Sequence, residues 1–305
     1  MSFTGNVKNE VSKIDQGKTE NIAELSAFLR NNALITDTIR ISTENSSVAR
    51  LIFRLFKDIY SVISKITVRH GYNYHKKYIY LLEINKKVDE IIKDLDLHEE
   101  IPGDYLIDDE LTKRAYIRGL FLACGSINDP KKSRYHLEFV VDSESYAKFL
   151  SGLLNEFDLN SKTLKRDNKY MIYIKEAEKI GDFLRMISAI QSLFYFEDIR
   201  IYRDHKNMTN RLNNCEQANV DKIIETAAMQ VRDIELIEKY GGLDLLNEKE
   251  QVVAFYRLKY REASLVELSE IISFETETKI TKSGLYHRFN KIKELANKIR
   301  EKDIT

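Results

Sequence analysis

The chain has 305 residues, of which 43% are apolar, and its 17 Tyr and 14 Phe can fill a sizeable core. Because 48 Lys and Arg balance 48 Asp and Glu, any contact with nucleic acid must come from local clusters of positive charge rather than from the total. The two cysteines lack metal-ligand spacing, which predicts reduced thiols. The chain shows neither a signal-peptide pattern nor the ~18 continuous apolar residues that a membrane-spanning helix needs, so we expect a cytoplasmic protein rather than a membrane protein.

Hydrophobic periodicity divides the first 98 residues into helices and strands. Apolar residues three and four apart predict helices, and alternation of apolar and polar residues predicts strands. The predicted helices cover residues 4–14, 21–32, 46–63 and 86–95. The predicted strands cover residues 37–43, 65–69 and 77–84, and the last two form a hairpin about a turn at residues 71–73.

Two glycines mark the stretch from residue 115 to 128, which reads AYIRGLFLACGSIN. Gly119 lies inside a helical pattern, where glycine costs about 1 kcal/mol relative to alanine, so we expect a second backbone to approach it closely. Gly125 lies where the helix ends and a strand begins. This spacing resembles the LAGLIDADG motif of homing endonucleases. In that family two such helices pack side by side, and each supplies an acidic residue that holds a metal ion over DNA.

The second half of this region repeats the first. Residues 116–124 match 24–32, residues 137–154 match 39–56, and residues 169–176 match 77–84. The repeat predicts two tandem α-β-β-α-β-β-α units; the alternative is an unrelated α+β domain with chance similarity. The motif position of the metal-binding acid is Cys124, and its counterpart is Asn32. Because neither side chain suits Mg²⁺, we expect the fold without the nuclease reaction, with no catalytic residue, metal or cofactor.

The first hairpin is rich in basic residues. In the endonuclease family the corresponding sheet forms a saddle over the duplex, so basic side chains on it would contact phosphates. We expect secondary DNA backbone contacts from Lys65, Arg69, Lys76 and Lys77; the alternative is an ordinary solvated hairpin tip. His70 and His75 lack a third ligand nearby, so a metal site is not expected.

Residues 199–219 are dense in asparagine and carry Arg203, Lys206 and Arg211. Asparagine favours turns, so this stretch is interpreted as the segment that leaves the first domain. The three cations are further candidates for backbone phosphate contact, and the alternative is a polar linker whose asparagines cap helices.

The remaining residues follow a helical period. Helices are predicted over residues 221–239, ended by Gly241 and Gly242, and over residues 248–260. Ser264 with Glu267 forms a capping box that opens a third helix. After a polar turn at residues 273–279, a last helix of about 20 residues begins at Thr281. This order is typical of a helix-turn-helix DNA reader.

The last helix concentrates positive charge, with eight Lys or Arg against two Glu between residues 279 and 302. Its N-terminal residues would meet base edges or phosphates. The DNA-binding candidates are Lys282, Ser283, Tyr286, His287, Arg288 and Lys291. The expected core pairs Leu285, Phe289, Ile292, Leu295 and Ile299 with Leu265, Leu268 and Ile271. A basic surface helix without a ligand is the alternative.

The stretches AYIRGLFLACGSINDPKKSRYHLEF, NRLNNCEQAN and ASLVELSEI with ITKSGLYHRFNKI resemble the WhiA family of bacterial regulators. The resemblance implies an α+β fold class, with tandem LAGLIDADG-like repeats followed by an all-α helix-turn-helix domain. The expected domains are residues 1–98 (first half with an N-terminal helix), 99–210 (second half), 211–220 (linker) and 221–305 (DNA-binding domain).

The resemblance also implies a cytoplasmic, nucleoid-associated protein that binds double-stranded DNA. Family members act in transcription, sporulation, cell division or chromosome segregation, and regulatory or division proteins are expected partners. Two other classes stay open. One is a protein-interaction adaptor whose DNA binding is secondary, and the other is an active nuclease using Glu24, Asp37, Asp129 or Glu138.

Overall fold

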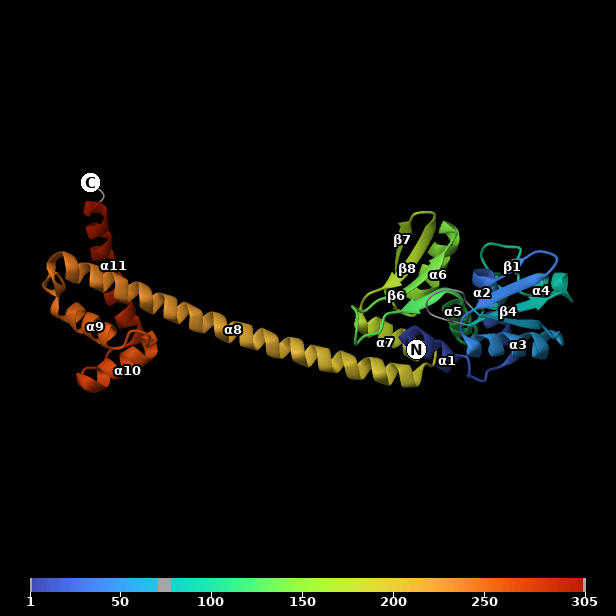
Figure 1. Cartoon of the computed structure of the whole chain (residues 1–305), viewed down its shortest axis with the longest axis horizontal. Helices are drawn as coiled ribbons and strands as arrows, with labels where there is room; N and C mark the ends of the chain where they lie inside the picture. Colours follow the sequence, from blue (N-terminus) through green and yellow to red (C-terminus); the bar gives the residue numbers. More distant parts are fainter. Residues whose placement is uncertain (1, 71–77, 304–305) are drawn as a thin grey trace. The chain divides into compact units, whose positions relative to one another are not determined.

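The computed structural model describes residues 2–70 and 78–303. The chain divides into two compact units, residues 1–204 and residues 205–305, and each unit has a hydrophobic core of its own (Figure 1). Within the described residues, none of the helices combines the length and the apolar character needed to cross a bilayer.

The first unit begins with α1 (Phe3–Val11) and continues with two copies of one motif. The first copy contains α2 (Lys18–Asn32), β1 (Leu34–Ile35), β2 (Ile39–Thr43), α3 (Ser46–Tyr60), β3 (Lys65–His70), β4 (Tyr78–Ile84) and α4 (Val88–Asp94). After a short 3-10 turn, η1 (Asp104–Leu106), the second contains α5 (Glu110–Cys124), β5 (Gly125–Ile127), β6 (Leu137–Val141), α6 (Glu144–Glu156), β7 (Lys162–Arg166), β8 (Lys169–Ile174) and α7 (Ala177–Met186). The predicted tandem repeat is confirmed.

Each copy folds into an antiparallel four-stranded sheet with the same topology. The strand orders are β1-β2-β4-β3 and β5-β6-β8-β7, drawn in blue to cyan and in green in Figure 1. The register corrects one part of the sequence alignment. Ile39 pairs with Ile84, and its equivalent Leu137 pairs with Ile174, so β4 and β8 match two residues away from the predicted alignment. Because strand side chains alternate with a period of two, a two-residue slip leaves every side chain on the same face and the hydrophobic pattern unchanged.

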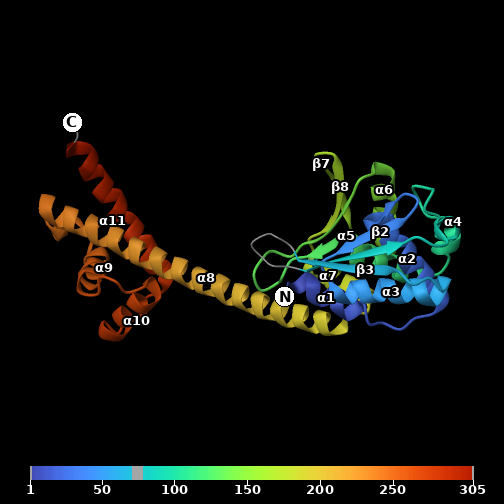
Figure 2. The same ribbon diagram turned by 45° about the vertical axis from the view of Figure 1, so that its right-hand side comes forward.

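Helices α2 and α5 pack against each other along their length, and both views show them between the two sheets (Figure 2). A Cβ added at Gly119 would overlap the carbonyl oxygen of Glu24 and lie 2.8 Å from its carbonyl carbon. The predicted close approach at Gly119 is therefore confirmed. Gly125 has an extended backbone, with φ −75° and ψ 145°. This position requires glycine because of crowding, since an added Cβ would lie 2.8 Å from the Cα of Phe121.

Helix α8 (Ile190–Gly241) begins in the first unit and ends in the second. Residues 199–219 lie inside this helix, so the prediction of a turn-forming segment there is wrong. Asparagine in a helix interior costs only a few tenths of a kcal/mol to about 0.7 kcal/mol, and no glycine or proline interrupts the chain from residue 190 to 240. The helix ends at the predicted place, where Gly242 takes a left-handed φ of 78°.

The second unit also contains η2 (Leu243–Leu245), α9 (Glu248–Lys259), α10 (Leu265–Glu275) and α11 (Lys282–Asp303). The predicted capping box opens α10, because the Ser264 hydroxyl accepts from Glu267 N at 3.2 Å and Glu267 Oε2 accepts from Ser264 N at 2.7 Å. The predicted packing of the last helix is confirmed. Leu268, Leu285, Phe289 and Ile292 are buried in one cluster, and the partly buried residues Leu265, Ile271, Leu295 and Ile299 pack against it.

Candidate nucleic-acid interface

Helix α11 begins at a side-chain cap and presents two different faces. The Thr281 hydroxyl accepts from Gly284 N at 3.2 Å, so the helix starts at Lys282. Burial of Leu285 and Phe289 turns the other side of the first two turns outward. The sequence candidates on this outward side are exposed, namely Lys282, Ser283, Tyr286, His287 and Lys291, and Arg288 is half-buried.

Two neighbouring contacts limit how freely these side chains move. The rings of Tyr286 and His287 lie 6.1 Å apart, edge to face. The Lys291 ammonium lies 3.9 Å from a carboxylate oxygen of Glu250 on α9. The Glu250 side chain is 10% exposed and the Lys291 side chain 67% exposed, so the ammonium can also reach an anion from solvent.

In the first sheet, Lys65 and Arg69 lie on the exposed strand β3. Arg40 belongs to the same face, because Lys65 and Arg40 flank Glu83 from opposite sides in the register, and Arg40 Nε lies 3.2 Å from Glu83 Oε1. Arg40 was not among the sequence candidates, although its position between the apolar residues Ile39 and Ile41 indicates that it points to the opposite, exposed face of the strand. Lys76 and Lys77 lie outside the described residues, as does the expected turn at residues 71–73.

The equivalent face of the second sheet carries cations at both ends, with Glu138 in the same row as Lys162, and is apolar in the middle. Lys162, Arg166 and Lys169 lie on it, and Lys169 Nζ is 3.1 Å from Asp142 Oδ1. Between them Val140, Met171 and Leu164 form one row across three strands. These residues were not among the sequence candidates, because the cations of the second hairpin are spread along two strands rather than clustered in the sequence.

Arg203 differs from the other cations of the junction. Its guanidinium donates to the carbonyl oxygens of Pro130 at 2.7 Å and Ser133 at 2.8 Å and lies 4.9 Å from the centroid of the Tyr135 ring. These contacts anchor the loop that the second copy adds before β6. Lys206 and Arg211 are exposed on α8.

The C-terminal ends of α2 and α5 carry the residues that correspond to the metal-binding acids of the endonuclease motif. These residues are Asn32 and Cys124. Lys8 of α1 reaches the same end of α5, where its ammonium donates to the Leu122 carbonyl at 3.0 Å. Burial lowers the pKa of Lys8 to about 8, and burial raises the pKa of the Cys124 thiol to about 12, a shift that the Lys8 charge opposes.

This residue set does not fit a divalent metal. Mg²⁺ requires carboxylate and water oxygens, whereas α5 ends with a protonated thiol beside an ammonium. Lys8 compensates the negative end of the α5 dipole, the place that a metal would otherwise take. The sequence held no signal for this role, since Lys8 and Leu122 are 114 residues apart.

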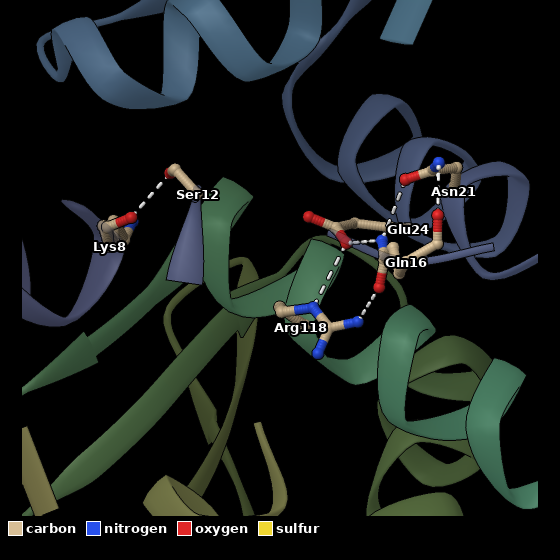
Figure 3. A network of polar contacts seen from close by, with 6 residues as sticks. All are labelled: Lys8, Ser12, Gln16, Asn21, Glu24 and Arg118. Carbon is tan, nitrogen blue, oxygen red and sulfur yellow. Dashed lines mark hydrogen bonds and ion pairs between the residues drawn. The ribbon is translucent and has the colours of Figure 1, made fainter. Parts of the chain in front are cut away.

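A buried polar network crosses the α2–α5 contact (Figure 3). Arg118 Nε lies 3.1 Å from Glu24 Oε2, and Gln16 bridges the two side chains by hydrogen bonds to both. Glu24 and Arg118 are only 2% and 6% exposed. Burial raises the pKa of Glu24, and Arg118 opposes that shift.

The four carboxylates considered for a nuclease do not form one site. Glu24 is paired with Arg118, Asp37 is exposed, Asp129 Oδ1 accepts from Lys131 N at 2.9 Å, and Glu138 lies 3.1 Å from His136. Across residues 2–70 and 78–303, no three His, Cys, Asp or Glu side chains gather in a way that could hold a metal ion.

Comparison with known proteins agrees with this architecture in all parts of the chain. Family models match residues 18–98 as the WhiA N-terminal LAGLIDADG-like domain, residues 113–206 as the WhiA LAGLIDADG-like domain and residues 209–296 as the WhiA C-terminal HTH domain. The full-length DUF199/WhiA crystal structure from Thermatoga maritima is similar, with 26% identity and a TM-score of 0.58, and the match covers 98% of this chain and 99% of that chain.

Curated relatives extend the match over nearly the whole length. A probable cell division protein WhiA from Staphylococcus aureus (strain JH9) is 41% identical, and one from Staphylococcus carnosus (strain TM300) is 40% identical. Each alignment covers 98% of this chain and 98% of the relative. By its three domains and its full-length similarity, the chain belongs to the WhiA family.

Proposed function

We propose that this protein binds double-stranded DNA in a sequence-specific way through α11, as a regulator of transcription, sporulation or cell division at the bacterial nucleoid. The observation that carries the proposal is the two-sided character of α11. Its apolar side is buried in the helix-turn-helix core, and its N-terminal outward side is basic and exposed. That combination is what a recognition helix needs to enter the major groove. The division role rests on the names of the curated relatives.

In this proposal the first unit adds affinity without catalysis. Basic side chains on the sheet faces, such as Arg40, Lys65 and Lys162, would contact phosphates and so add salt-dependent binding. The replacement of the motif acids by Asn32 and Cys124, with Lys8 beside the latter, supports the absence of nuclease chemistry. Cleavage of plasmid DNA that depends on Mg²⁺ would support the nuclease alternative instead.

The test is selection of binding sites from a random duplex pool with the full chain at two salt concentrations. The double variant Lys282→Ala with Arg288→Ala should lose specific binding, because each lost bidentate or charged base contact costs about 1–3 kcal/mol. A matched double variant, Lys249→Ala with Arg50→Ala, removes two cations outside α11 and should keep the selected motif. Unchanged affinity of the Lys282–Arg288 variant for that motif would refute the proposal.

A protein-interaction adaptor is the second candidate, and the apolar row of Val140, Met171 and Leu164 favours it. Val140 and Leu164 are 38% and 50% exposed, which is unusual for a surface that only contacts phosphates. Failure of the full chain to enrich any motif at either salt concentration would favour this candidate over the first.

A further inference from the structure

The second unit contains a cavity of about 420 Å³ whose lining has cations but no carboxylate. Four helices form it, namely α8, α9 through Arg257, the start of α10 and the start of α11. Its polar lining residues are Asn219, Lys222, Thr226, Arg257, Ser264 and Lys282. Such a one-sided charge distribution is unusual in a chain with equal numbers of acidic and basic residues, and it raises the question of what neutralises the cavity.

Arg257 is the central feature of the cavity, because it is a buried charge with unused donors. Its side chain is 0% exposed. Nη1 donates to the carbonyl oxygens of Tyr260 at 3.2 Å and Ala263 at 2.6 Å, whereas Nε and Nη2 have no hydrogen-bond partner among the described residues. The guanidinium lies 5.4 Å from the centroid of the Phe289 ring.

No carboxylate within the described part of the chain forms an ion pair with Arg257. Burial lowers its pKa to about 10, so it stays protonated at neutral pH. A buried charge without a counter-ion is costly, and an anion that reached Nε or Nη2 would relieve that cost with charge-assisted hydrogen bonds.

The start of α10 adds donors to the same cavity. Ser264, Leu265 and Val266 all line it. The capping box uses the amides of Ser264 and Glu267, and the amides of Leu265 and Val266 are first-turn groups that have no partner within the helix. An 11-residue helix directs the positive end of its dipole to this point. Lys222 and Lys282 are exposed at the edge of the cavity.

We propose that this cavity is a phosphate-binding site, in which Arg257 and the α10 N-terminus hold the phosphate oxygens and Lys222 and Lys282 neutralise the remaining charge. A phosphate suits the cavity because Arg forms bidentate contacts with tetrahedral oxyanions and a helix N-terminus supplies amide donors. The phosphate has two possible sources. One is the DNA backbone, and in that case the inference rests on the proposed function and the site fixes α11 on the duplex through Lys282. The other is a free phosphorylated ligand that would occupy the site without DNA.

The first arm of the test measures free phosphate. Inorganic phosphate and pyrophosphate are titrated into the full chain without DNA, at ionic strength held constant with chloride, by calorimetry and thermal unfolding. Arg257→Lys should weaken binding by about tenfold or more, since lysine cannot make the bidentate contact. Lys222→Gln should weaken it less and leaves the buried core untouched. Lys249→Gln, an exposed lysine on α9, is the matched control and should bind like the wild type.

The second arm measures DNA. For a duplex of random sequence, Lys222→Gln should reduce the slope of log affinity against log salt by about one if a backbone phosphate occupies the site, and Lys249→Gln should leave the slope unchanged. Free phosphate binding with an unchanged slope identifies a free ligand as the source. A reduced slope without free phosphate binding identifies the DNA backbone.

The proposal is overturned if the wild type binds neither phosphate nor pyrophosphate and Lys222→Gln leaves the salt slope unchanged. Arg257 would then serve only to hold the turn between α9 and α10. The two proposals can fail separately, because a chain that binds phosphate but no DNA loses only the proposed function, and a chain that selects a DNA motif with no change in either arm loses only the phosphate site.

Discussion

Gly119 is the residue on which the packing of the first unit depends most directly. Alanine at this position gains about 1 kcal/mol of helix propensity, but its Cβ would overlap the Glu24 backbone, which cannot move unless α2 and α5 separate. We expect Gly119→Ala to lower the free energy of unfolding by about 1–3 kcal/mol net, measured in denaturant. Gly152→Ala in α6 is the control, because nothing lies within 4 Å of an added Cβ there. It should be neutral or stabilising, and equal effects of the two substitutions would contradict the packing argument.

Lys8 makes stability depend on pH in the alkaline range. Its pKa is about 8 in the folded chain and about 10.4 in an unfolded one. Between these values the unfolded chain binds more protons, so the Lys8 contribution to stability rises with pH, is complete above the unfolded pKa and is lost as pH falls through the folded pKa.

Lys8→Met removes this titration and keeps the length of the side chain. Between neutral pH and the unfolded pKa, the free energy of unfolding of the wild type, minus that of the variant, should increase by up to about 3 kcal/mol. Denaturant unfolding of both proteins across this range measures the difference, in which the titrations of other groups largely cancel. Parallel pH profiles of the two proteins would show that Lys8 is not buried as a cation.

Helix α8 is an element whose start depends on a distant side chain. Its first turn is capped by Glu10 of α1, which accepts from Gln191 N at 2.6 Å, from Ser192 N at 3.0 Å and from the Ser192 hydroxyl at 2.7 Å. A carboxylate at this end also interacts favourably with the helix dipole.

Glu10→Ala should therefore destabilise the first unit by about 1–2 kcal/mol, detected as a lower midpoint of denaturant unfolding. Glu225→Ala removes an exposed carboxylate from the middle of the same helix and serves as the control, with little effect expected. If both substitutions had the same small effect, the α1–α8 cap would contribute nothing measurable.

At the scale of the whole molecule, a chain without net charge carries its positive charge in separate places. They are the outward side of α11, the edges of the two sheet faces and the cavity around Arg257. Each would add phosphate contacts, so DNA affinity of the full chain should fall steeply with salt. Specificity should depend on α11 alone, because only base contacts carry sequence information.

The sequence by itself determined the repeat, the glycine at the helix contact, the capping box of α10 and the two-sided character of α11. The capping box and the two-sided character of α11 depend on residues within a few turns of each other, through local hydrogen bonding and periodicity. The repeat and the glycine could be recognised because similar patterns recur along the chain and because a glycine inside a helical pattern indicates a close contact. The junction at residues 199–219 was mispredicted because asparagine only weakly opposes a helix. The alignment of β4 with β8 was wrong by two residues because a slip of two residues preserves the alternating pattern of a strand.

Only the tertiary structure decided which polar groups meet. The contacts of Lys8 with Leu122 and of Glu10 with Ser192 join residues 114 and 182 positions apart. The place of Arg257 in a cavity whose lining has no carboxylate depends on four helices at once. No local pattern encodes such contacts, because each side chain alone has the same propensity wherever its partner lies. Burial then lowers the pKa of Lys8. The lack of a carboxylate beside Arg257 among the described residues follows from packing that the order of residues does not reveal.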